Sequence, residues 1–213
     1  MLPLDVPHCE RTGAGVRHRG IRRAGAGIDT IMRLLAERRP DVQARPHALR
    51  SPPLGADLGL LLLRLTVGLL MAGHGAQKLF GFYDGYGLGG TGRAFAALGF
   101  HPGRFYAGLA GASEFLGGLG LAAGLFTPLA AAAVLGVMIN AMILGVPHGL
   151  WTNVGGIEYP MCLGAAALAI AAIGPGRFAL DRPFRWRDGG LGCAAFALGV
   201  GGLGAALIQL LGL

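Results

Sequence analysis

The sequence predicts an all-α protein: a polytopic transmembrane helix bundle with four core spans and a fifth span at the C-terminus. Hydrophobic residues make up 53% of the chain and charged residues 14%, whereas a soluble domain has about 25% charged residues. The 40 glycines suit membrane helices, whose backbones approach closely at small residues. The third observation is a series of long apolar segments over residues 58–213, separated by polar or glycine-rich links.

The N-terminal segment, residues 1–55, is expected to be a basic and mostly disordered cytoplasmic arm. It is rich in Arg, Gly and Pro and mostly lacks an apolar period. Its ten arginines and five acids give a net charge of +5. A short amphipathic helix over residues 29–39, capped by Asp29, is the one exception that we expect. An arginine-rich arm beside membrane spans favours a role in topology, so we expect no nucleic-acid partner.

Five apolar segments follow the arm. A helix needs about 20 residues to span a bilayer, which makes the fourth segment the shortest candidate. We expect spans at residues 57–80, 105–126, 128–146, 158–173 and 191–213. Residues 56–182 would then form a four-helix membrane domain, and residues 183–213 a basic linker followed by a terminal hydrophobic helix.

The connections predict how the helices are arranged. Thr127 and Pro128 form a tight link, so the second and third helices should be antiparallel neighbours. We expect residues 82–104 to be a long glycine-rich loop. Basic residues concentrate in the arm and in residues 174–190, and the positive-inside rule therefore places both on the cytoplasmic side.

Ionisable residues lie inside two of these apolar segments. An ionisable group at bilayer depth is costly unless it pairs or lines a polar cavity. At 100° per residue, His74 and Lys78 share one stripe of the first helix with Arg64. Glu114 lies on a glycine-rich face of the second helix. From the depths of the two residues we expect Arg64 and Glu114 to form a buried ion pair. Such a pair either serves a chemical site or is a structural clasp that fixes helix register.

Other polar residues are expected near the outer side of the bundle. Asn140 falls at a depth similar to that of Glu114, while His148 and Glu158 lie in or next to an outer loop. Together they predict a polar vestibule leading inward. The histidine spacing matches no compact ligand motif, so we expect no metal site. The lone cysteines form no C-x-x-C motif and no disulfide framework.

Several of these segments resemble the DoxX family. The run from Arg64 to Gly81 is similar to the first-helix signature of that family, and the run from Gly111 to Pro128 to its second-helix signature. His148, residues 153–158 and residues 174–181 resemble later motifs. The resemblance implies a small four-helix protein of the bacterial inner membrane. Family members are linked to membrane-bound redox systems, including quinone-coupled oxidation of sulfur compounds and thiol or oxidative-stress complexes.

The resemblance and the polar stripe together suggest a membrane subunit of an oxidoreductase complex that binds a quinone or a small substrate. Glu114 and His74 would be the catalytic proton-relay residues. The sequence has no haem, flavin or Fe–S signature, so electrons would come from a protein partner. The substrate-binding residues would be Arg64, Lys78, Asn140, His148 and Glu158. Two alternatives stay open: a non-enzymatic scaffold or assembly subunit, and a small transporter.

Overall fold

The structure, a computed structural model, describes residues 54–212 of the chain. Within this range it contains six α-helices and no strand, which confirms the predicted all-α bundle. The predicted arm and its helix at residues 29–39 lie outside the described residues. The helices are α2 (Leu54–Phe80), α3 (Gly87–Ala97), α4 (Gly103–Ala123), α5 (Thr127–Gly145), α6 (Glu158–Ile173) and α7 (Leu191–Gly212), with short 3-10 turns at Val146–His148 and Thr152–Val154.

Three of the described helices are long and apolar enough to cross a membrane: α2, α5 together with the turn that follows it, and α7. The fourth expected span, α6, is apolar but has 16 residues. Helix α4 has 21 residues and is rich in glycine and alanine, and its length of about 31 Å matches the hydrocarbon core. A multi-pass membrane protein is thus supported by the length and composition of its helices.

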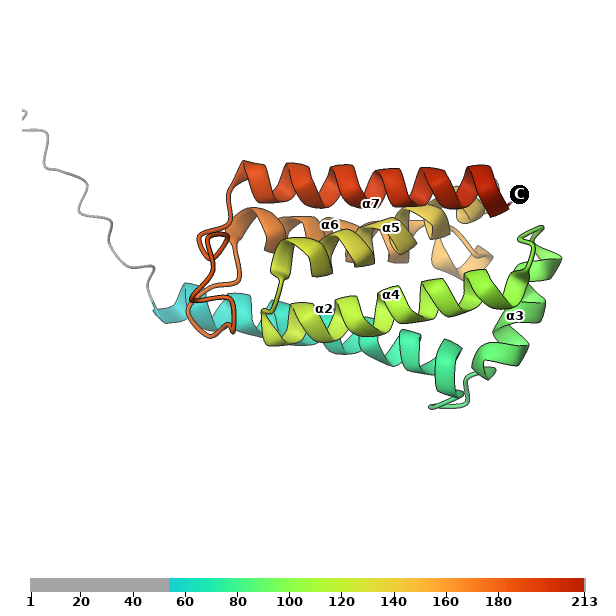
Figure 1. The fold of residues 1–213 in the computed structure, drawn as a ribbon, viewed down its shortest axis with the longest axis horizontal. Helices are drawn as coiled ribbons and strands as arrows, with labels where there is room; N and C mark the ends of the chain where they lie inside the picture. The colour runs from blue at the N-terminus through green and yellow to red at the C-terminus, as the bar shows by residue number, and fades with distance from the viewer. Residues whose placement is uncertain (1–53, 213) are drawn as a thin grey trace, which may run out of the picture. The chain divides into compact units, whose positions relative to one another are not determined.

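The bundle is built around α5, which packs against α4, α6 and α7. Helices α2 and α4 lie side by side, and α7 lies on the opposite side of α5 (Figure 1). The core is formed by buried apolar side chains of the long helices, among them Met71, Leu121, Val134, Leu135 and Ile170. Because the helices alternate in direction, the α4–α5 link and the α6–α7 loop lie at one end of the bundle, as the sequence predicted.

Glycines fix the register between α2 and α4. A Cβ added at Gly68 would lie 2.5 Å from the carbonyl oxygen of Gly118, so the two backbones are in direct contact. Gly75 lies seven residues after Gly68 on α2, and it contacts the backbone at Gly111, which lies seven residues before Gly118 on α4. The predicted small-residue seam on the second helix is therefore real, and only glycine fits at these crossings.

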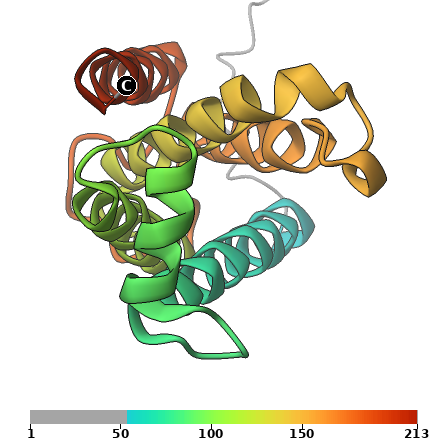
Figure 2. The same ribbon diagram turned by 90° about the vertical axis from the view of Figure 1, so that its right-hand side faces the viewer.

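Residues 82–104 differ from the expected loop, because they contain helix α3, which crosses the ends of α2 and α4 (Figure 2). The expectation rested on the glycines of this segment. In the structure two of these small residues allow packing: Gly92 lies against the backbone at Arg104, and a Cβ at Gly103 would meet the Ala96 backbone nitrogen at 2.6 Å. Tertiary packing thus overrides the weak intrinsic helix propensity of this segment.

Candidate functional site

Arg64 does not pair with Glu114, and this prediction is wrong. The guanidinium is buried, with 1% of the residue exposed. Its Nε donates to the carbonyl oxygen of Leu121 at 3.0 Å, and its Nη2 donates to Ala122 O at 3.0 Å and to Phe178 O at 3.1 Å. Its Nη1 donates to Pro175 O. Arg64 therefore bonds backbone carbonyls of α4 and of the α6–α7 loop.

The glycine register explains the error. The α2–α4 crossings place Arg64 opposite Ala122, near the C-terminal end of α4. The last carbonyls of a helix have no partner within the helix, and the Arg64 guanidinium supplies donors for two of them. The pairing was predicted from the depths of Arg64 and Glu114, which were counted from the ends of the apolar segments. This count fixes neither where the helices begin and end nor how far α2 is shifted along α4.

Asp181 holds the same end of the bundle together. It is fully buried and accepts hydrogen bonds from the backbone nitrogens of Phe126 at 2.8 Å and Thr127 at 2.7 Å, and from Thr127 Oγ1 at 2.7 Å. The carboxylate thus satisfies the free N–H groups at the start of α5. Nearby, Asp57 accepts a bond from the backbone nitrogen of Arg177 at 3.3 Å. The side chains of Arg64, Asp181 and Asp57 therefore join the helices and the α6–α7 loop at this end of the bundle. These three residues and their hydrogen-bond partners form a structural site, which we name the structural lock.

Glu114 instead pairs with Lys78, with 2.6 Å between Lys78 Nζ and Glu114 Oε2. The Glu114 side chain is 4% exposed and that of Lys78 is 26% exposed. Lys78 stands fourteen residues beyond Arg64 on α2, or about 21 Å along the axis. The ion pair and the structural lock are therefore separate sites on the same helix.

His74 extends the polar site toward α6. Its Nδ1 lies 3.1 Å from Gln77 Oε1 and its Nε2 lies 2.8 Å from the hydroxyl of Tyr159. His74 and Lys78 lie one helical turn apart on α2, so the two bonded pairs are neighbours. The cluster of Lys78, Glu114, His74 and Tyr159 is called the polar cluster below. Its members come from α2, α4 and α6.

The ion pair of the polar cluster lies in the wall of a cavity of about 680 Å³. The cavity is bounded mainly by α4, α5 and α7, and its lining is largely apolar. Its polar lining residues are Lys78, Ser113, Glu114 and Asn140, and aromatic rings line it at Phe95, Phe100, Phe105 and Tyr106. An apolar chamber with a few polar groups on its wall is the usual form of a small-molecule site.

The structure brings together only some of the predicted site residues. Asn140 lines the cavity, donates to Gly136 O at 3.1 Å and accepts a bond from Gln209 Nε2 of α7 at 2.7 Å. His148 and Glu158 are not among the lining residues. The sequence did not predict the bond from Gln209 to Asn140 or the place of Phe95 of α3 in the cavity lining. Both depend on which helices pack against one another.

A comparison with known families matches one part of the chain. The DoxX family model matches residues 59–147. This segment is similar to the DoxX family. No curated protein and no solved structure matches the chain. The matched segment contains Arg64, Lys78, Glu114 and Asn140, and the resemblance to DoxX seen in the sequence is confirmed there.

The DoxX match ends within the 3-10 turn after α5, so α6 and α7 lie beyond it. Both nevertheless complete the site. Tyr159 of α6 bonds His74, and α7 supplies one wall of the cavity, including Gly204, Leu207 and Ile208. The candidate site therefore extends beyond the segment that matches the DoxX family. The described residues contain no group of three His, Cys, Asp or Glu side chains placed to hold a metal ion.

Proposed function

We propose that the protein is the membrane subunit of a redox system and that its cavity binds a quinone or a similar small amphipathic substrate. In this proposal it spans the bacterial inner membrane several times with its N-terminus in the cytoplasm. A protein partner supplies the electrons. The observation that carries the proposal is the Lys78–Glu114 ion pair in the wall of a large, mostly apolar cavity.

Lys78 is suited to hold a carbonyl or anionic oxygen. An ammonium group has three N–H donors, and the structure uses one of them for Glu114. The side chain is partly exposed and lines the cavity. A ring with a carbonyl group would place its oxygen at Lys78 and its apolar edge against the aromatic lining. Arg64 has no such role here, because it is buried, does not line the cavity and donates four hydrogen bonds to backbone carbonyls.

Glu114 and His74 are suited to move a proton to such a ligand. Glu114 lines the cavity itself, whereas His74 is bonded to Tyr159 and Gln77 outside it. We therefore assign Glu114 the contact with substrate and His74 the position behind it. General acid–base groups need hydrogen-bond reach of the reacting atom, which the lining position of Glu114 provides.

The test is quinone binding to the full-length protein purified in mild detergent. We expect quinone to co-purify, and we expect Lys78→Met and Glu114→Gln each to weaken binding by about tenfold or more, as for the loss of one charge-assisted contact. His148→Gln is the control, since this residue does not line the cavity. A preparation without bound quinone that also fails to bind added quinone would overturn the proposal.

The scaffold alternative has one observation in its favour. The buried charges at the other end of the bundle, Arg64 and Asp181, are bonded entirely within the protein. If the polar cluster served only the same purpose, replacing Lys78 and Glu114 together by apolar residues would preserve the activity of the parent complex. Loss of that activity with an intact fold would favour the redox site.

A further inference from the structure

The loop between α6 and α7, residues 174–190, presents an unusually basic surface. All four of its arginines are exposed: Arg177, Arg182, Arg185 and Arg187. Its two acids do little to offset them. Asp181 is buried and bonded to the start of α5, and Asp188 lies 3.5 Å from Arg187. The surface therefore has three arginines without an ion-pair partner among the described residues.

The backbone of this loop is fixed at several points. Arg64 of α2 donates hydrogen bonds to the carbonyl oxygens of Pro175 and Phe178 in the loop. Leu180 N donates to Ala123 O at 3.2 Å, and Asp181 N donates to Gly124 O at 2.9 Å. A preformed loop loses little conformational freedom when it binds a ligand. The buried charges Arg64 and Asp181 thus help to fix the backbone of the loop that carries the arginines.

Aromatic rings lie beside these arginines. Phe184 and Trp186 are stacked with 4.9 Å between ring centroids and 7° between planes, and Phe126 lies 5.6 Å from Phe184. The Trp186 indole nitrogen is covered and has no hydrogen-bond partner among the described residues. Trp with neighbouring apolar rings is typical of the headgroup level of a membrane.

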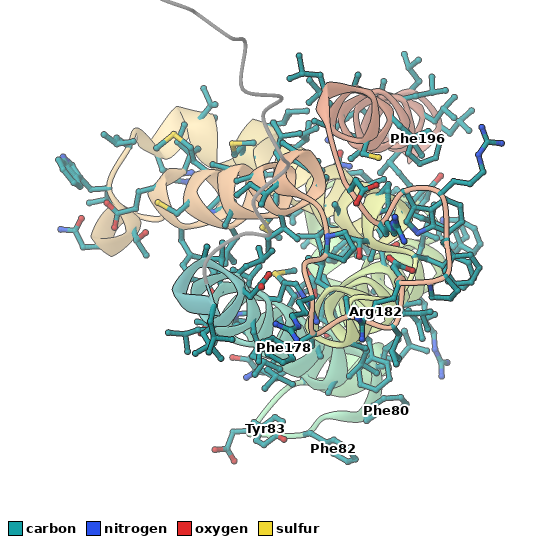
Figure 3. The ribbon with its side chains drawn as sticks, turned by 90° about the vertical axis from the view of Figure 1, so that its left-hand side faces the viewer. Phe80, Phe82, Tyr83, Phe178, Arg182 and Phe196 are labelled. Carbon is teal, nitrogen blue, oxygen red and sulfur yellow. The ribbon has the colours of Figure 1, made fainter. Side chains whose placement is uncertain are left out.

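We infer that the α6–α7 loop binds the headgroup of an anionic phospholipid. Three features support this partner: the four exposed arginines, the cluster of aromatic rings in the same loop, and the position of the loop at one end of a bundle of apolar helices. Figure 3 looks onto this end, with Phe178 and Arg182 of the loop in view. A phosphodiester accepts bidentate bonds from guanidinium groups. Near an anionic membrane surface each arginine adds to the attraction.

Tryptophan quenching by brominated lipids tests this inference directly. The chain has two tryptophans, so the Trp151→Phe variant has Trp186 as its only tryptophan fluorophore. Trp151 lies near the opposite end of the bundle, away from the loop. The protein is placed in phosphatidylcholine vesicles that contain a minor share of brominated phosphatidylglycerol or of brominated phosphatidylcholine. We expect brominated phosphatidylglycerol to quench Trp186 more strongly. Equal quenching by the two lipids would overturn the inference.

Matched variants then assign the effect to the arginines. Arg182→Gln with Arg185→Gln should lower the preference for phosphatidylglycerol by about tenfold or more, at about 1 kcal/mol per arginine. Arg93→Gln with Arg104→Gln removes the same charge at the other end of the bundle and should leave the preference unchanged. If both double variants lost the preference for phosphatidylglycerol equally, the preference would depend on the net charge of the protein. That result would overturn a binding site on the loop.

A measurement on the unaltered protein guards against variants that fail to fold. Native mass spectrometry of the protein with equal amounts of phosphatidylglycerol and phosphatidylcholine should retain mainly phosphatidylglycerol. Inorganic phosphate added in excess should not displace it, because the free ion lacks the acyl chains that hold the lipid at the membrane surface. Equal retention of the two lipids, or displacement by phosphate, would count against a phospholipid site.

Discussion

Two charged residues of helix α2, Arg64 and Lys78, have different hydrogen-bond partners. Near one end, Arg64 gives its donors to backbone carbonyls of α4 and of the α6–α7 loop. Near the other end, Lys78 bonds Glu114 with one donor and remains partly exposed in the wall of a cavity. A charge whose donors are mostly bonded within the protein stabilises a fold, whereas a charge with free donors beside a cavity is available to a ligand. The number of hydrogen-bond partners therefore distinguishes the environment of Arg64 from that of Lys78 within one helix.

The sharpest test of this comparison is the removal of Arg64. Arg64→Met leaves several buried carbonyls without a donor, so we expect a loss of about 3–5 kcal/mol in the free energy of unfolding. Unfolding by denaturing detergent in mixed micelles measures this loss. Arg182→Met, at an exposed arginine, is the control and should change stability by about 0.5 kcal/mol or less. A similarly small loss for Arg64→Met would contradict the structural role.

The register that separates the two ends can be tested with one substitution at two glycines. Gly68→Ala puts a methyl group 2.5 Å from the Gly118 carbonyl oxygen, and we expect it to cost about 1–3 kcal/mol through overpacking. Gly59→Ala meets nothing within 4 Å and should be neutral or stabilising, since alanine favours helix. The same unfolding assay compares them. Equal effects at both positions would mean that the α2–α4 contact is not tight.

Pairing itself is tested by two double-mutant cycles that share Glu114→Gln. With Lys78→Met, we expect a coupling energy of about 1 kcal/mol or more, because the two charges are in contact. With Arg64→Met, the coupling should be below about 0.5 kcal/mol, since the sites are well separated. Unfolding free energies of the single and double variants give both values. Strong coupling of Arg64 with Glu114 would restore the pair predicted from the sequence.

The smallest effect is expected at the edge of the polar cluster. Tyr159→Phe removes the hydroxyl that lies 2.8 Å from His74 Nε2, at a cost of about 0.5–1.5 kcal/mol. Because this site is partly solvent-accessible, substrate binding should be more sensitive than stability. Comparison of quinone affinity with unfolding free energy separates the two. Tyr83→Phe, at an exposed tyrosine, is the matched control.

The order of the helices and the inward polar stripe of α2 could be predicted from the sequence, because apolar length and helical period are local properties. The identity of each charge's partner could not. Arg64 and Glu114 are the most conspicuous opposite charges in the apolar segments, but the contacts of Gly68 and Gly75 set a register that keeps them apart. Backbone carbonyls, which bond Arg64, have no signature in a sequence.

The cavity was less predictable still, since helices that are distant in sequence build it. The polar residues Lys78, Glu114 and Asn140 were recognised because charge and amide groups are rare in apolar segments. The aromatic lining from Phe95 and Phe100 was not, because the segment that carries them was interpreted as a loop. Glycine content alone cannot distinguish a flexible connection from a helix packed closely on its neighbours.

The position of α7 has a kinetic consequence. The terminal helix α7 lines one side of the cavity. It contacts the bundle at Gly201, which approaches α5, at the Asn140–Gln209 bond, and at its C-terminal end, where His101 N donates to Gly212 O. If the cavity binds a ligand that is dissolved in the bilayer, as proposed, displacement of α7 would be a direct route from the lipid into it. The rates of entry and exit would then depend on the strength of these α7 contacts and on the viscosity of the surrounding lipid.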